Sequence, residues 1–148
     1  MKLEVEITGV AELKKNIAKL GDEFTKYLEA AVMAGALPVQ NAAKEKAPYK
    51  TGTLRRSIHM ETKSKSPERV EVAVGTDVVY AAIQEFGGTI TPKRAKMLRF
   101  VIGGQEIFAK RVQIPPHPYL RPALDEKKNA AIDEMGAALK QILERVDY

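Results

Sequence analysis

Cysteine is missing from this 148-residue sequence, and tryptophan is missing as well. Without thiols the chain has no disulfide framework, no thiolate metal site and no cysteine nucleophile. Aromatic residues make up only 6% of the chain, so we expect a core of leucine, isoleucine, valine, alanine and methionine. The rest of the composition, 45% hydrophobic and 29% charged, is that of an ordinary globular protein. We expect a single domain over residues 1–148.

Long apolar runs and metal-binding motifs are absent too. The longest apolar run, AAVMAGALPV at residues 30–39, is well short of the ~20 residues that a membrane helix needs. The two histidines, His59 and His117, lie far apart, and no HxxxH or HxxE spacing occurs. We therefore expect no membrane segment, no metal and no cofactor.

Signatures of catalysis are lacking as well. The segment KTGTLRR has a single glycine, so it does not match a phosphate-binding loop. Ser57 lacks the GxSxG setting of an activated serine. The paired carboxylates, such as Asp125 and Glu126, fall near predicted helix starts or on polar helix faces, where capping and solvation explain them. We expect no enzyme.

Positive charge is plentiful and concentrated in the middle of the chain. The net charge of +5 divides into −1 for residues 1–40, +8 for residues 41–121 and −2 for residues 122–148. Such a basic block favours an acidic partner, either nucleic acid or the acidic face of another protein. It is equally consistent with a solvated surface that keeps the protein soluble, and the sequence leaves both interpretations open.

Helical periodicity dominates both ends of the chain. Apolar residues at spacings of three and four predict helices over about 11–20 and 22–46, with Gly21-Asp22 between them. Pro38 should kink or divide the second helix near Leu37. Another amphipathic pattern predicts a long helix of some seven turns that begins near Tyr119 or Leu120.

Strand patterns lie at the start and in the middle. LEVEIT at residues 3–8 alternates like a strand with one buried face. We expect one hairpin from residues 54–65 and 69–76, a short helix in VVYAAIQEFGG, and a second hairpin from MLRFVI and EIFAKRV around Gly103-Gly104. These elements predict an α+β fold: an antiparallel sheet of two hairpins plus the N-terminal strand, packed with two N-terminal helices and one long C-terminal helix.

Three separated segments together resemble one known family. APYKTGTLRRSI (residues 47–58), YAAIQEFGG (80–88) and PPHPYLRPALDE (115–126) are similar, in the same order, to the signatures of the gp-ten-like minor tail components of siphophages and prophages. Members of that family are called head–tail joining, neck or tail-completion proteins. Tyr49 and Lys50 depart from the pattern, because the family often has an aspartate there.

The resemblance implies a structural virion protein of the tail or neck, made in the bacterial host cytoplasm. It implies a homo-oligomeric ring, often six-fold, that contacts other phage neck or tail proteins and has neither activity nor cofactor. Tyr80 and Phe86 would fix the short helix to the sheet. The partner interface would then draw on exposed or turn-forming residues, namely Thr51, Gly52, Arg55, Arg56, Lys93, Arg94, Lys96, Pro118 and Arg121.

A small basic nucleic-acid-binding module is the alternative from another class. Arg55, Arg56 and the basic residues of loop 91–97 could follow a phosphate backbone without reading its sequence. Against this interpretation, no helix-turn-helix or RNA-binding signature occurs. Phe100 and Phe108 have apolar neighbours, so we expect them in the core instead of on a base-stacking surface.

Overall fold

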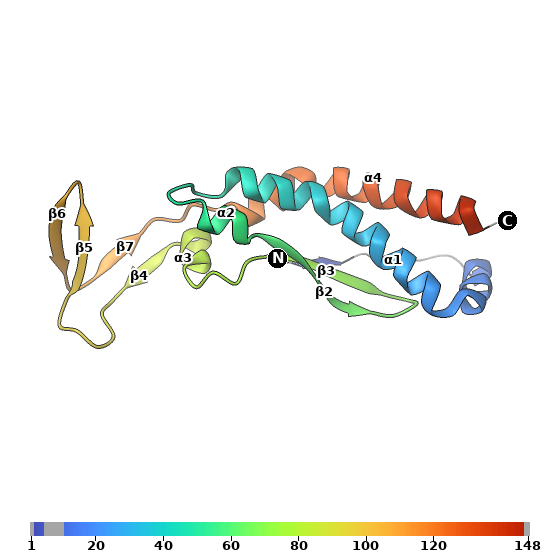
Figure 1. Cartoon of the computed structure of the whole chain (residues 1–148), viewed down its shortest axis with the longest axis horizontal. Helices are drawn as coiled ribbons and strands as arrows, with labels where there is room; N and C mark the ends of the chain where they lie inside the picture. The colour runs from blue at the N-terminus through green and yellow to red at the C-terminus, as the bar shows by residue number, and fades with distance from the viewer. Residues whose placement is uncertain (1, 5–10, 147–148) are drawn as a thin grey trace. The chain divides into compact units, whose positions relative to one another are not determined.

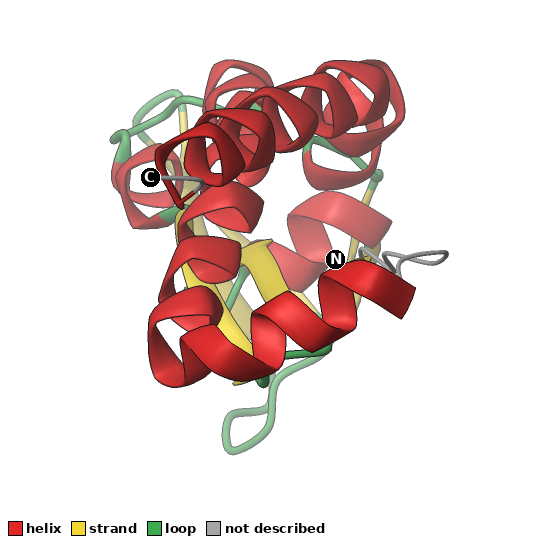
Figure 2. Ribbon diagram, turned by 90° about the vertical axis from the view of Figure 1, so that its right-hand side faces the viewer, coloured by secondary structure: helices red, strands yellow, loops and turns green. Residues whose placement is uncertain are grey.

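A computed structural model describes residues 2–4 and 11–146 of the chain, and it describes side-chain surroundings for residues 21–145. The chain divides into two compact units. Unit 1 comprises residues 1–77 and 119–148, and unit 2 comprises residues 78–118. Within unit 1 a long helix, a second long helix and a small sheet pack together, as Figures 1 and 2 show.

The first helix, α1, runs over Ala11–Lys46 and has two pieces. Gly21 separates them, because its φ of 52° and ψ of −129° are not helical. A residue without a Cβ adopts this conformation at little cost, and the dark-blue first piece of α1 runs in a different direction from the rest of the helix (Figure 1). The predicted pair of helices over residues 11–20 and 22–46 is therefore confirmed.

Pro38 does not divide α1. Within the helix only Gly21 has non-helical backbone angles, so the predicted division near Leu37 is wrong. Proline removes one amide donor, which leaves the Ala34 carbonyl without its usual helical partner four residues on. Packing of the flanking residues Ala36 and Val39, both fully buried, holds the helix together across this missing bond.

The second long helix, α4, spans Leu120–Val146 and packs along α1 (Figure 1), which confirms the predicted C-terminal helix. Small side chains make this contact close. A Cβ built on Gly35 of α1 would lie 2.2 Å from Met135 Cγ and 2.6 Å from the Ala131 carbonyl oxygen of α4. Ala123, Ala131 and Met135 are buried on the facing side of α4. Glycine at position 35 therefore sets how closely the two helices approach.

The sheet of unit 1 has three antiparallel strands in the order β1-β3-β2. They are β1 Lys2–Glu4, β2 His59–Lys65 and β3 Val70–Gly75. Val70, Val72 and Val74 of the central strand are buried and alternate with half-buried residues, as the sequence predicted. Helix α1 contacts both this sheet and α4, so it forms the middle layer. The predicted strand beyond Glu4 lies outside the described residues.

A short helix replaces the start of the first predicted hairpin. The prediction placed a strand from Leu54, but residues Thr53–Ser57 form helix α2 and β2 begins only at His59. Leu54 and Ile58 are both buried, and their spacing of four residues suits one helical turn over the core. The connector from α1 to the sheet is thus a turn followed by a helix.

Unit 2 contains one short helix and two separate two-stranded sheets. Helix α3 covers Ala81–Phe86, and the predicted stop at Gly87 is confirmed by its φ of 68°. A Cβ at Gly87 would lie 2.8 Å from the Ile114 carbonyl oxygen, so glycine also permits a close approach. The four strands are β4 Gly88–Ile90, β5 Leu98–Ile102, β6 Gln105–Ala109 and β7 Val112–Ile114.

The pairing is β5 with β6 and β4 with β7, both antiparallel. The predicted second hairpin around Gly103 and Gly104 is confirmed, and so is the α+β class. The hairpins nevertheless do not join into one sheet, because β5–β6 pairs only with itself. The run EIFAKRV also divides at residues 110–111, and its last part pairs with β4, which the sequence did not predict.

Candidate interaction surface

The opening turn of the first signature depends on a glycine. Gly52 has a φ of 75° in the left-handed region, and its backbone is buried between two side chains. A Cβ there would lie 2.8 Å from Arg56 Nη1 and 2.9 Å from Tyr49 Cε2. The hydroxyls of Thr51 and Thr53 lie 2.9 Å apart on the exposed side. Thr51 and Gly52 thus shape the turn, and the exposed side chain of Arg56 lies against it.

Arg55 has a different role from its neighbour. Its guanidinium lies over the Tyr49 ring, 5.1 Å from the ring centre, and its Nη2 donates to the Glu45 carbonyl oxygen at 3.4 Å. Because Glu45 is next to the last residue of α1, the cation interacts with a helix C-terminus, where positive charge is favourable. Arg55 therefore stabilises the connector itself.

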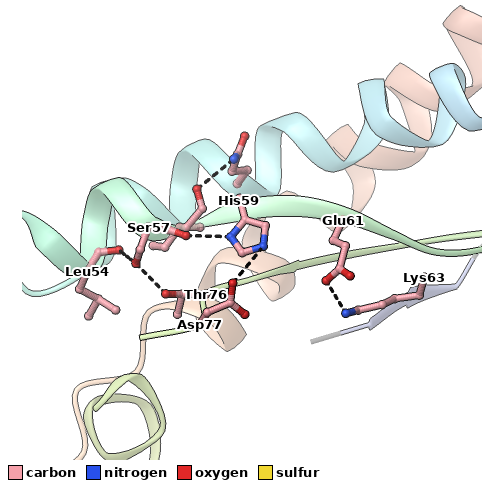
Figure 3. A network of polar contacts seen from close by, with 9 residues as sticks. Leu54, Ser57, His59, Glu61, Lys63, Thr76 and Asp77 are labelled. Atoms are coloured by element: carbon pink, nitrogen blue, oxygen red, sulfur yellow. Dashed lines mark hydrogen bonds and ion pairs between the residues drawn. The ribbon is translucent and has the colours of Figure 1, made fainter. Parts of the chain in front are cut away.

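A network of polar contacts fixes the start of β2 (Figure 3). The Ser57 hydroxyl donates to the Leu54 carbonyl at 2.8 Å and lies 2.6 Å from the Thr76 hydroxyl. The His59 ring places Nδ1 2.9 Å from the Ser57 carbonyl oxygen and Nε2 3.8 Å from an Asp77 carboxylate oxygen. The imidazole thus meets the serine's carbonyl and not its hydroxyl, so Figure 3 shows no activated nucleophile.

A second set of contacts ties α1 to β2. The buried Gln40 amide donates to the Ile58 carbonyl oxygen at 3.1 Å. Glu29 accepts from the Thr62 hydroxyl at 2.7 Å and from the Lys65 ammonium at 3.2 Å. The hydrogen bond from Thr62, followed by that from Lys65, holds the pKa of the Glu29 carboxyl below its ordinary value of 4.5. The carboxylate form of Glu29 therefore supports the layer contact.

The basic residues predicted for an interface fall in several places. Lys93, Arg94 and Lys96 lie in the loop of residues 91–97 in unit 2, where all three side chains are exposed. Pro118 is the last residue of unit 2, and Arg121 is an exposed residue in the first turn of α4 in unit 1. The structure brings together Thr51, Gly52, Arg55 and Arg56. The interface role of all nine residues stays a prediction.

Sequence reasoning missed the apolar surface of the hairpin β5–β6. Phe108 is 57% exposed, Val101 59% and Ile102 60%, so the prediction that Phe108 lies in the core is wrong. Phe100 is half-buried. No other element of unit 2 packs closely against either strand, and a lone two-stranded hairpin has no third layer to cover it.

Both faces of this hairpin carry apolar side chains. The pairing Phe100 with Ile107 and Leu98 with Ala109 puts apolar residues opposite each other on one face. The other face has Phe108 opposite Arg99, whose guanidinium pairs with Glu106. Such an arrangement suits contact with a partner better than permanent exposure to water.

Helix α3 adds to the apolar surface of unit 2. Phe86 is 74% exposed and Tyr80 is also exposed, so the predicted role of both in fixing this helix to the sheet is wrong. Ala81 is the buried apolar residue of α3. Within this six-residue helix the aromatic side chain, Phe86, is mostly exposed to solvent.

A shallow groove lies on unit 1 between α1 and α4. Its apolar lining includes Leu37, which is 45% exposed, and Pro38. Its polar lining includes Glu45, Glu134 and Lys127. Lys127 pairs at 3.3 Å with Glu126, and within the described part of the chain neither Glu45 nor Glu134 has an ion-pair partner. The groove therefore combines an apolar floor with two available carboxylates.

The described residues contain neither a metal-ligand cluster nor a membrane-spanning helix. No cluster of three or more histidine, aspartate or glutamate side chains there has the arrangement of a metal site. None of the helices described has the length and hydropathy needed to cross a lipid bilayer.

Comparison with protein families identifies the chain. Residues 11–87, which are 77 of the 148 residues, match the family of bacteriophage HK97 gp10-like tail components. The match includes the first signature and nearly all of the second, whereas the third lies beyond it. Comparisons with curated proteins and with solved structures give no match. The chain belongs to the HK97 gp10-like family of phage tail components.

Proposed function

We propose that this tail component acts in head–tail joining or tail completion, by assembling into a ring with copies of itself and docking on other neck or tail proteins. Its activity is association, and no bond is made or broken. The family supports the structural role. The observation that carries the assembly step is the apolar hairpin β5–β6, exposed on both faces in the single chain.

The charge distribution supports the same proposal. Unit 2 has six basic and two acidic residues, a net charge of +4, whereas unit 1 is nearly neutral at +1. The positive charge of unit 2 would attract it to acidic protein surfaces, and its exposed apolar side chains would then be buried against them. The exposed residues Lys93, Arg94 and Lys96 would contribute to that attraction.

The polar network of Figure 3 supports an architectural role for the first signature. Ser57 and Gln40 hold the start of β2 through hydrogen bonds to the Leu54 and Ile58 carbonyl oxygens, and Gly52 permits the turn before α2. A rigid connector positions the exposed Arg56 beside it at low entropic cost. Non-enzymatic function is consistent with this use of the polar groups.

Deletion of the gene from the phage that encodes it tests the proposal. Negative-stain images should show filled heads and unattached or open-ended tails, and a plasmid copy should restore joined particles. Native mass spectrometry of the assembled protein should give a multiple of the 16.4 kDa chain mass, six-fold for a hexamer. Normal, joined and infectious particles without this protein would overturn the proposal.

A second test measures binding of the protein to DNA, which is the competing function. Binding to a short duplex should be weak and should fall steeply as salt rises, without dependence on sequence. Tight binding that distinguishes one duplex sequence from another would favour a nucleic-acid-binding module instead of an assembly protein.

A further inference from the structure

We propose that the hairpin β5–β6 of one copy docks into the α1–α4 groove of the next copy. This inference rests on the proposed ring assembly and names the two surfaces that form its repeating contact. One face of the hairpin presents Phe108 and Val101 to solvent, and Ile102 is exposed on the opposite face. The groove presents Leu37 and Pro38, so apolar side chains on both surfaces leave water together.

The charges of the two surfaces are complementary. Exposed cations lie before β5 and after β6, at the open end of the hairpin, namely Lys93, Arg94, Lys96, Lys110 and Arg111. The groove is bordered by Glu45 and Glu134, whose carboxylates have no ion-pair partner among the described residues. Attraction between these groups selects this orientation and speeds encounter.

Pro38 gives the groove a further acceptor. Because proline lacks an amide hydrogen, the Ala34 carbonyl oxygen has no donor at the usual helical position, and both residues line the groove. A lysine, an arginine or an edge-strand amide of a neighbouring copy can donate to such a carbonyl. The hairpin offers amides of this kind, since each of its strands pairs on one side only.

The dimensions also agree. Five residues of strand, as in β5 and in β6, extend about 17 Å. The groove follows α1 from Ala34 to Glu45, and eleven helical steps rise about 16 Å. The apolar part of the hairpin therefore matches the length of the surface it would cover.

Two different surfaces in contact make the association heterologous. Each copy then keeps one hairpin and one groove free for further copies, and the series of contacts forms a ring where the rotation between neighbours closes. A symmetric dimer would instead bury the same patch on both copies and would stop at two. The proposed contact is therefore compatible with a ring, whereas a symmetric dimer is not.

Cysteine cross-linking tests the contact directly, since the natural chain has no cysteine. Phage particles are prepared with the double variant Phe108→Cys/Leu37→Cys, and disulfides are formed by mild oxidation. We expect a ladder of linked multimers on a non-reducing gel. In a mixture of the single variants Phe108→Cys and Leu37→Cys, the largest linked product should be a dimer that joins one copy of each variant.

The matched control is Phe108→Cys/Ile132→Cys. Ile132 is 60% exposed on α4, five residues from Lys127 and two from Glu134, which puts it on another face of that helix than the groove. The contact would be overturned if particles that contain the protein gave no ladder with Phe108→Cys/Leu37→Cys. It would also be overturned if Phe108→Cys/Ile132→Cys gave an equal ladder. Either result would leave the proposed role in tail assembly intact. Joined particles that lack the protein altogether would overturn both proposals.

A charge swap guards against variants that merely assemble poorly. Lys93→Glu/Arg94→Glu/Lys96→Glu in the loop, or Glu45→Lys/Glu134→Lys in the groove, should each lower the yield of joined particles at least tenfold. Combining the two sets in one chain should recover most of that loss, because opposite charges face each other again. A combined variant no better than the worse parent would overturn the docking. The loop variant could also lose binding to DNA. If adding the groove change restored that DNA binding, the recovery would be explained without contact between copies, and the docking would be overturned.

Discussion

Unit 1 and unit 2 treat their apolar side chains in opposite ways. In unit 1, α1 lies between the sheet and α4, and phenylalanine and valine residues such as Phe24, Val39 and Val72 are buried. In unit 2, Phe86 and Phe108 are mostly exposed. Apolar residues therefore stabilise the core of unit 1, whereas in unit 2 they form an exposed apolar surface.

This difference separates the apolar surface that is buried when the chain folds from the apolar surface that is available for assembly. Hydrophobic burial stabilises a chain only where side chains leave water on folding. Unit 1 gains this free energy in the single chain. The hairpin β5–β6 would gain it later, against a partner, which explains why a protein of a tail assembly retains such a surface.

Phenylalanine substitutions give the largest contrast between the units. Phe24→Ala should lower the free energy of unfolding by about 3–5 kcal/mol, because it removes a buried ring from α1. Phe108→Ala should change the stability of the free chain by less than about 0.5 kcal/mol, because the ring is mostly in water. Urea unfolding of both variants checks this. Equal losses would mean that the hairpin is covered in the single chain.

The glycines of the two long helices sharpen the description of unit 1. Gly35→Ala should cost about 1–3 kcal/mol, since the new methyl group would collide with Met135 and with the Ala131 carbonyl. Gly136→Ala on α4 is the matched control, because nothing lies within 4 Å of the added Cβ. It should stabilise the chain by about 0.5–1 kcal/mol through helix propensity. Thermal unfolding with the opposite order of stabilities would contradict the close helix contact.

The contact of Glu29 in α1 with Thr62 and Lys65 in β2 should have a smaller effect on stability, and this effect should depend on pH. Glu29→Gln should lower the free energy of unfolding at neutral pH by about 0.5–1.5 kcal/mol, through weaker bonds to Thr62 and Lys65. The pKa of Glu29 is lowered on folding, so its contribution is complete above 4.5 and is lost as the pH falls through the folded value.

The difference between the natural chain and Glu29→Gln should therefore shrink in acid. Glu23→Gln, at an exposed position of the same helix, is the control and should be nearly neutral at every pH. Denaturant titrations between pH 7 and pH 3 measure both variants. A difference that grows as the pH falls would contradict the assigned direction of the pKa shift.

The sequence predicted what depends on local pattern. The valines of β3 alternate over six residues, and Gly21 interrupts a helical stripe, so both features were visible before the structure. The sheet partner of β4 was not, because its three residues pair with β7 more than twenty positions later. Helix α2 was missed since five residues are too few to show a helical period.

The candidate site was only partly predictable, for a related reason. Gly52 was predicted to form a turn, and its φ of 75° is that of a glycine in a turn. Arg55 and Arg56 look equivalent in sequence, yet only the fold puts one of them over Tyr49. Phe108 sits in a strand pattern that a core strand would share. Its exposure depends on the absence of a covering layer in unit 2, which no local pattern records.

Hydrogen exchange measured residue by residue, in the free chain and in assembled particles, tests the central claim most directly. In the free chain, amides of β5 and β6 should exchange much faster than those of β3, which pairs on both sides. In particles, protection should rise by at least tenfold in β5, β6 and the α1–α4 groove, and should stay unchanged in β3. Protection of the hairpin that is already high in the free chain, or that does not change on assembly, would contradict the account.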